Sequence, residues 1–67
     1  MSIDAAPEPE LLTIPEVAEL LKVSASTVRL LQQRRQIPFI KIGGSVRFET
    51  TDVLAYLEKR RVRAIDQ

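Results

Sequence analysis

The sequence predicts a small α+β domain in which two N-terminal helices precede a two-stranded β-hairpin and a C-terminal helix. Apolar residues recur at helical spacing on both sides of a central segment, and that segment alternates with a period of two around Gly43-Gly44-Ser45. Capping residues also precede the helical stretches. A chain of 67 residues is long enough for one small core. We expect a leader at 1–10, a domain at 11–63 and a tail at 64–67.

The leader is predicted to be disordered. It carries two prolines among alanine and acidic residues and shows no apolar periodicity. Such a segment buries too little apolar surface to offset the entropy lost on ordering.

The first predicted helix covers 14–21. Thr13 and Glu16 have the spacing of a capping box, and Pro15 falls in the first turn, where its missing N–H costs nothing. The apolar residues Ile14, Val17, Ala18 and Leu21 then share one face.

The second predicted helix covers 25–35, with Ser24 as its N-cap. Val28, Leu31 and Arg35 lie on one side of this helix. About three residues separate the two helices, which is the length of a helix-turn-helix connection.

Two short strands, 39–42 and 46–49, are predicted after Pro38. A two-residue turn would pair Ile42 with Ser45 and Lys41 with Val46, which mixes polar and apolar side chains on each face. A three-residue turn instead pairs Ile42 with Val46.

We predict the three-residue turn, because it creates one apolar inner face of Ile40, Ile42, Val46 and Phe48. It also places Lys41 directly opposite Arg47 on the outer face. Like charges in such a pair favour a bound anion.

The third predicted helix starts near Thr51, with Thr50 as its cap and Asp52 in its first turn. One face, containing Val53, Tyr56 and Leu57, is expected to enter the core. Four cations lie near its end, and they complement the helix dipole or contact a partner molecule or a neighbouring protomer: Lys59, Arg60, Arg61 and Arg63.

Charge is segregated along the chain although its formal net value is only +1. Residues 1–19 hold five acidic residues and no basic one, whereas residues 20–67 hold ten basic and four acidic residues. The segment 22–47 contains six basic residues and no acidic one. A polyanionic partner would explain this run, and a solvated face balanced by the acidic leader is the alternative.

Several classes of function are excluded by composition. The chain has no cysteine and no histidine, which removes disulfides, zinc sites, thiol nucleophiles and histidine acid–base chemistry. The domain's carboxylates show no arrangement with a nucleophile or a second metal ligand, so we expect no enzyme, metal, cofactor or small-molecule ligand. The longest apolar run, 53–57, is far below the ~20 residues that span a bilayer. We therefore expect a soluble cytoplasmic protein without membrane contact.

The predicted order of elements is that of a winged helix-turn-helix, and five stretches resemble the excisionase/MerR-like DNA-binding family along about residues 11–58. They follow one another in the family's order and spacing: Leu12–Leu21, Val23–Val28, Ile37-Pro38 with Lys41–Gly43, Arg47-Phe48, and Asp52–Leu57.

This resemblance implies that the second helix enters the major groove, that the hairpin is a wing reaching toward the minor groove or backbone, and that the third helix supports both. Some members of the family are recombination directionality factors that bind neighbouring sites cooperatively, bend DNA and steer a phage or mobile-element integrase toward excision. Others are small transcription regulators. The excisionase role is our leading hypothesis, for a bacterial or phage-encoded, nucleoid-associated protein.

Two alternatives stay open. A transcription regulator would use the same surface on a single operator. A protein-interaction module would bind a partner through the acidic leader and the first helix, with incidental DNA contact.

Three positions depart from the usual family pattern. Lys22 stands where a glycine commonly makes the turn, and left-handed strain is expected there. Arg35 replaces the glycine that often ends the second helix, so this helix either continues toward Gln36 or ends with a less relaxed cap. The wing tip, Gly43-Gly44-Ser45, lacks the basic residues frequent in the family, which shifts phosphate contact to Lys41 and Arg47.

The candidate base-reading residues project from the second helix on the side opposite Val28 and Leu31: Ser26, Arg29, Leu30 and Gln33. Arginine pairs with guanine and glutamine with adenine, each contact giving ~1–3 kcal/mol of discrimination. Leu30 would contact a thymine methyl group or be buried by a bend of the helix.

The candidate phosphate and wing residues combine cations with hydroxyls and backbone near the first turn of the second helix and in the hairpin: Lys22, Ser24, Thr27, Arg34, Lys41, Gly44, Ser45 and Arg47. Such a small monomer makes few base contacts, so we expect cooperative self-association on double-stranded DNA, or an integrase (recombinase) partner.

Overall fold

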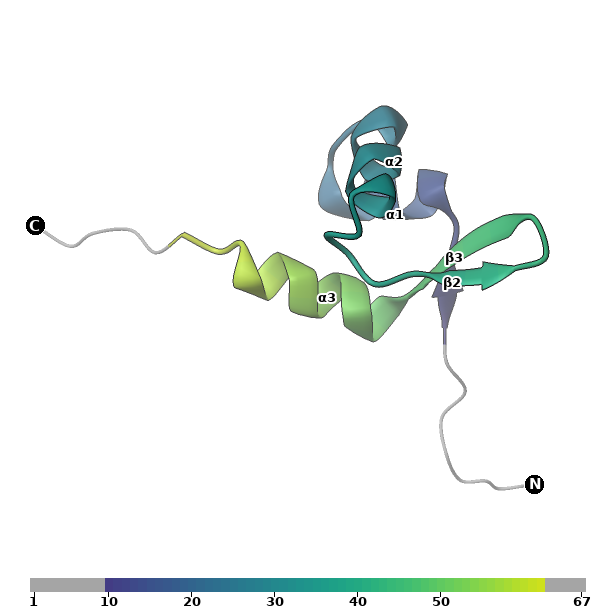
Figure 1. Cartoon of the computed structure of the whole chain (residues 1–67). Coiled ribbons are helices and arrows are strands. Elements are labelled where there is room, and N and C mark those ends of the chain that lie inside the picture. The colour runs from purple at the N-terminus through teal and green to yellow at the C-terminus, as the bar shows by residue number, and fades with distance from the viewer. Residues whose placement is uncertain (1–9, 63–67) are drawn as a thin grey trace, which may run out of the picture.

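A computed structural model describes residues 10–62 and confirms the predicted α+β arrangement (Figure 1). The elements follow in the order β1 (Leu11–Leu12), α1 (Ile14–Leu21), α2 (Ala25–Gln33), β2 (Ile40–Ile42), β3 (Ser45–Glu49) and α3 (Thr50–Lys59). The predicted tail, and the predicted leader apart from Glu10, lie outside the described residues.

Both N-terminal helices begin at the caps that the sequence predicts. The Thr13 N–H donates to Glu16 Oε1 at 2.8 Å, and the Glu16 N–H donates to Thr13 Oγ1 at 3.3 Å, which completes the capping box. In α2 the Thr27 N–H donates to Ser24 Oγ at 3.1 Å. These bonds satisfy N–H groups that the first turn of a helix leaves without a partner.

The turn between α1 and α2 is closed by Lys22, whose φ of 60° is left-handed. The next N–H, that of Val23, donates to the Ala18 carbonyl at 3.0 Å. The expected left-handed backbone at Lys22 is therefore confirmed. Because lysine has a Cβ, this conformation is strained.

Helix α2 ends at Gln33, two residues earlier than predicted, and Arg35 leaves the helical face on which we placed it. Arg35 adopts a φ of 55°, and the Gln36 N–H donates back to the Leu31 carbonyl at 2.9 Å. Of the two expectations for this end, the less relaxed cap is correct. Once one residue turns left-handed, the helical hydrogen-bond ladder cannot continue.

The sheet has three antiparallel strands in the order β1-β3-β2, and β1 was not predicted. Leu11 pairs with Glu49 and Leu12 with Phe48. A strand of two residues is too short to show an alternating pattern. It is recognisable only from its pairing with β3.

The predicted three-residue hairpin turn is wrong. Ile42 pairs with Ser45, which leaves a two-residue turn of Gly43 and Gly44. Gly43 has a φ of 59° whereas Gly44 does not have a positive φ, the pattern of a type II′ turn. A type II′ turn matches the twist of the strands. The chain adopts this turn although the resulting register mixes polar and apolar residues on each face of the hairpin.

The two-residue turn changes which side chains the hairpin buries. Lys41 pairs with Val46, and Ile40 pairs with Arg47, so Lys41 and Arg47 lie on opposite faces rather than opposite one another. Ile40 and Ile42 are on the outer face and remain 38% and 53% exposed, so their predicted place in the core is also wrong.

Helix α3 begins one residue earlier than predicted, and Thr50 does not cap it. The N-cap position belongs to Glu49, whose side chain makes no capping bond. The Thr50 N–H and hydroxyl instead donate to the Glu10 carbonyl, at 3.0 and 3.2 Å. Thr50 thus ties the start of α3 to the chain entering β1.

The core lies between the α1–α2 pair, the sheet and the first turns of α3. Tyr56 packs against it as predicted, whereas Leu57 is 44% exposed and does not belong to it. Its fully or nearly fully buried members come from every helix, from β3 and from the loop before β2: Val17, Ala18, Val28, Ile37, Phe48 and Val53. Among residues 10–62, no helix is long and apolar enough to cross a membrane.

Candidate nucleic-acid interface

The face of α2 that points away from the core carries the four candidate base-reading residues. Val28 is completely buried, and this orients the helix so that the side chains of Ser26, Arg29 and Gln33 are exposed. Leu30 is 43% exposed, so the alternative in which it is buried by a bent helix does not apply. An apolar side chain on this surface is available to a partner.

The cations around α2 form no ion pair with a carboxylate of the described residues. Lys22 lies in the turn before the helix, Arg29 on its exposed face and Arg34 at its C-cap, and all three are exposed. In the part of the chain that the structure describes, the ion pair is Arg61–Glu58, at the other end of the sequence. Within residues 10–62, no ion pair therefore neutralises the positive charge around α2.

The hydroxyls at the N-terminus of α2 bond to each other. Ser24 Oγ lies 3.0 Å from Thr27 Oγ1 and accepts the Thr27 N–H. Ser24 is thus the helix cap, as predicted, and Thr27 presents a hydroxyl beside the positive end of the helix dipole. Phosphate contact by Thr27 stays a prediction.

The wing presents its candidates on different faces. Lys41 is exposed on the face of Val46, while the half-buried Arg47 donates from Nη1 to the Val46 carbonyl at 2.9 Å. The backbone of Gly44 is open, because a Cβ placed there would meet no atom within 4 Å. Ser45, next to it, is also exposed.

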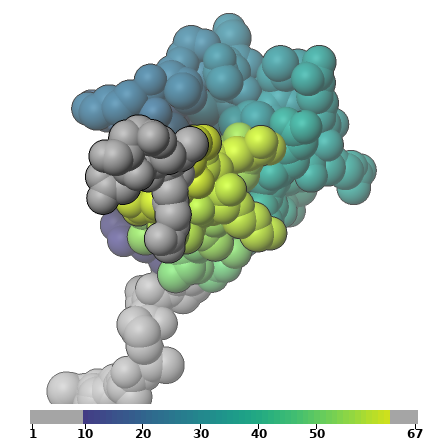
Figure 2. Space-filling view, turned by 90° about the vertical axis from the view of Figure 1, so that its left-hand side faces the viewer, coloured from purple at the N-terminus to yellow at the C-terminus, as the bar shows by residue number. Residues whose placement is uncertain are grey.

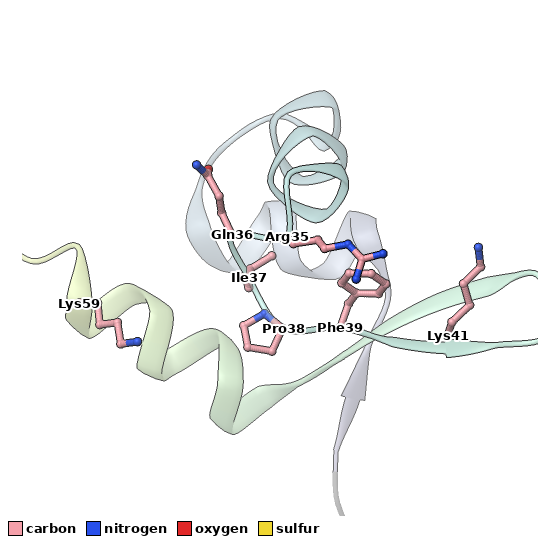
Figure 3. Close-up of a pocket in the computed structure, with 7 residues that line it drawn as sticks. All are labelled: Arg35, Gln36, Ile37, Pro38, Phe39, Lys41 and Lys59. Carbon is pink, nitrogen blue, oxygen red and sulfur yellow. The ribbon is translucent and has the colours of Figure 1, made fainter.

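A basic groove of about 750 Å³ lies between α2, the wing and α3. Its cations come from three elements: Arg35 from the turn after α2, Lys41 from β2 and Lys59 from α3 (Figure 3). Figure 3 shows Arg35 extending toward Phe39, with Lys59 on the far side of Pro38. We call this the basic groove.

Two members of the basic groove, Arg35 and Lys59, were absent from the predicted site residues. Sequence reasoning assigned Arg35 to the buried side of an extended helix and Lys59 to a general C-terminal cluster. One signal in the sequence could have placed Arg35: it stands where a glycine often ends the second helix. A left-handed residue at that position turns its side chain away from the helical register.

The remaining cations near the end of α3 are partly engaged. The Arg60 guanidinium lies 5.1 Å from the centroid of the Tyr56 ring, and Arg61 Nη2 lies 3.2 Å from Glu58 Oε1. Arg63 is outside the described residues. Between residues 10 and 62, no cluster of carboxylates could hold a metal ion.

Comparison with known families decides the class. A family model described as "Helix-turn-helix domain" matches residues 11–61, nearly all of the described chain. The chain belongs to this helix-turn-helix family. The family includes excisionases, and the chain therefore carries a DNA-binding helix-turn-helix domain with a hairpin wing.

Relatives of this helix-turn-helix chain fall into two groups. A protein named excisionase from Streptomyces ambofaciens is 42% identical over 57 residues, covering 85% of this chain and 92% of the relative. Uncharacterised proteins of Mycobacterium tuberculosis and Mycobacterium bovis are 38% identical over 65 residues, covering 97% of this chain. The chain spans 57% of the length of these mycobacterial relatives. No solved structure matches it.

Proposed function

We propose that this chain is a sequence-specific double-stranded DNA-binding protein of the excisionase type. In this role it binds repeated sites cooperatively, bends the DNA and directs an integrase toward excision. The observation that carries the proposal is the similarity to the Streptomyces excisionase, which extends over nearly the whole of both chains. The exposed cations around α2, which make no ion pair among the described residues, supply the matching chemistry.

Base reading is assigned to α2, lying in the major groove. Arg29 donates two hydrogen bonds to the O6 and N7 of a guanine, and Gln33 pairs with the N6 and N7 of an adenine. Leu30, exposed between them, contacts a thymine methyl group, and Ser26 accepts or donates to a base edge.

Phosphate contacts orient this helix and supply most of the affinity. Lys22, Thr27 and Arg34 bind the strand beside α2. The wing contributes Lys41, Arg47 and the open backbone of Gly44 and Ser45. The basic groove adds Arg35 and Lys59, which extends the contact along the backbone past the end of α2.

A domain of this size reads few base pairs, and a specific site must compete with a whole genome. Several copies on adjacent sites, or an integrase bound beside them, raise the effective concentration of each contact. DNA bending follows if neighbouring wings draw the backbone toward the protein, at a cost of a few kcal/mol that the added contacts offset.

The proposal is tested by selecting bound fragments from a random duplex library at near-physiological salt, using the wild-type protein and two variants. We expect closely spaced direct repeats to be enriched. Arg29→Ala should lose ~1–3 kcal/mol and relax the preference at one position, because a base contact is removed. Lys41→Ala is the matched control: it should keep the sequence preference and lower the salt slope by about one.

The arrangement of the selected sites separates the candidate functions. One isolated or palindromic site would contradict the excisionase proposal and indicate a transcription regulator. Absence of any enrichment would contradict specific DNA recognition and indicate a protein-interaction module. On the selected repeats, electrophoresis of circularly permuted fragments should show bending, and unbent DNA would contradict that part of the proposal.

A further inference from the structure

An apolar groove of about 340 Å³ lies on the side of the molecule where β1, α1 and the first residue of α3 meet. Leu12 and Leu20 supply its apolar surface, and Leu20 is 44% exposed. Three carboxylates line it: Glu10, Glu16 and Glu19. We call this the acidic groove.

The acidic groove is not a DNA-binding surface, because its carboxylates repel phosphates. Glu16 is held by the capping box of α1, whereas Glu19 is exposed and has no ion-pair partner among the described residues. An apolar floor with an anionic rim is complementary to a segment that combines aliphatic side chains with cations.

The far end of α3 offers that chemistry. Arg60 and Arg61 are exposed there, next to Leu57 and Val62, whose side chains are 44% and 91% exposed. In Figure 2 this end of α3, drawn in yellow, stands at the surface facing the viewer. Exposed cations and exposed aliphatic side chains therefore lie close together at this end of α3.

The two complementary surfaces lie at opposite ends of the same helix. Thr50, the first residue of α3, borders the acidic groove, and the helix runs ten residues away from it (Figure 1). At 1.5 Å per residue, about 15 Å separates the two ends. The basic end therefore cannot fold back into its own groove, whereas it can reach the groove of another copy.

We infer that the acidic groove receives the basic end of α3 from a second copy of this chain bound to the adjacent DNA site. The contact joins unlike surfaces, so each copy keeps one free groove and one free helix end, and copies add in a row rather than closing into a dimer. The inference rests on the proposed function for the adjacent sites, and it names the surfaces that make binding cooperative.

The test is a charge exchange measured on duplexes that carry one site or two adjacent sites. The cooperativity factor is the ratio of the two-site affinity to that expected from independent sites. Glu19→Lys and Arg60→Glu should each reduce this factor about fivefold, because each places like charges in the contact. The double variant should restore it, since the pair is reversed but again opposite in sign.

Glu58→Lys is the matched control. It makes the same change of charge as Glu19→Lys, but at the basic end of α3, where it removes the ion pair with Arg61 and adds positive charge to an attractive contact. It should keep or raise the cooperativity factor, the opposite of the effect of Glu19→Lys. Circular dichroism of each variant reports whether the fold is retained.

One result would overturn the inference while leaving the proposed function standing: a cooperativity factor above one that Glu19→Lys leaves unchanged. It would mean that the groove receives a different occupant, such as a cationic segment of a recombinase. Single-site binding by the wild-type protein with a cooperativity factor of one would overturn the inference together with the cooperative part of the proposed function. If the wild-type protein does not bind a single site at all, the proposed function is overturned together with the inference.

Discussion

Lys22 and Arg35 hold the left-handed backbone conformation just before and just after α2, with φ values of 60° and 55°. A residue with a Cβ pays ~1–2 kcal/mol for this conformation, which a glycine would not. Both residues are cations beside the proposed DNA surface. The chain thus accepts backbone strain at two places where a glycine would relax the turn but remove a positive charge.

Replacing Lys22 by glycine should stabilise the protein and weaken DNA binding. Relief of the left-handed strain outweighs the larger entropy of an unfolded glycine, so we expect a gain of roughly 0.5–1 kcal/mol in the free energy of unfolding. Urea denaturation measures this gain. Lys22→Ala is the control, because it removes the charge and keeps the strain. Equal unfolding free energies for the glycine and alanine variants would contradict the argument.

The face of α2 could be predicted from the sequence, whereas the basic groove could not. A helical projection places Arg29, Leu30 and Gln33 on one side whatever the rest of the molecule does. The groove instead requires Arg35, Lys41 and Lys59 to be brought together from three elements. No local pattern encodes that convergence.

Among the elements, α1 and α2 start at their predicted capping residues, whereas α3 does not start at Thr50 and the hairpin does not follow its hydrophobic pattern. The capping box at Thr13 is complete within four residues, so its signal is local. The hairpin register depends on a competition between turn geometry and burial. The glycine at position 43 favours the tight turn. Ile37 and Phe39, from the loop before β2, then supply the apolar side chains that pack in the core in place of those of β2. That compensation is a tertiary effect.

The two glycines of the hairpin turn should respond differently to substitution. A Cβ at either position meets no atom within 4 Å, so the difference lies in the backbone alone. Gly43→Ala should cost about 1 kcal/mol because of the positive φ, and Gly44→Ala should be close to neutral. Thermal unfolding of the two variants makes the comparison. A larger loss for Gly44→Ala would mean that the turn is of another type.

The stability of the molecule depends on a core to which residues 10–62 contribute six buried side chains, none of them polar, and Phe48 is the largest of these. Phe48 lies on β3, the central strand, and belongs to the same core cluster as buried residues of α1, α2 and α3. A core this small supplies only ~3–5 kcal/mol of net stability. The free energy lost when one large side chain is removed is therefore comparable with the total stability of the domain.

Phe48→Ala should leave the protein largely unfolded at room temperature, since such a truncation costs ~3–5 kcal/mol. Ile42→Ala should cost well under about 1 kcal/mol, because Ile42 is 53% exposed. Far-UV circular dichroism during urea titration compares the two variants. A severe loss in the Ile42 variant would indicate the three-residue register, in which Ile42 faces the core.

The pairing in the hairpin also determines where insertions and deletions are tolerated. Extra residues between Gly43 and Gly44 lengthen the tip and leave the ladder beyond it in place. Deletion of one residue between the tip and Phe48 would shift β3 by one position, turning Phe48 toward solvent and Arg47 toward the core. Among descendants of this sequence, wings should therefore vary freely at the tip, while the four residues from Ser45 to Phe48 keep their number.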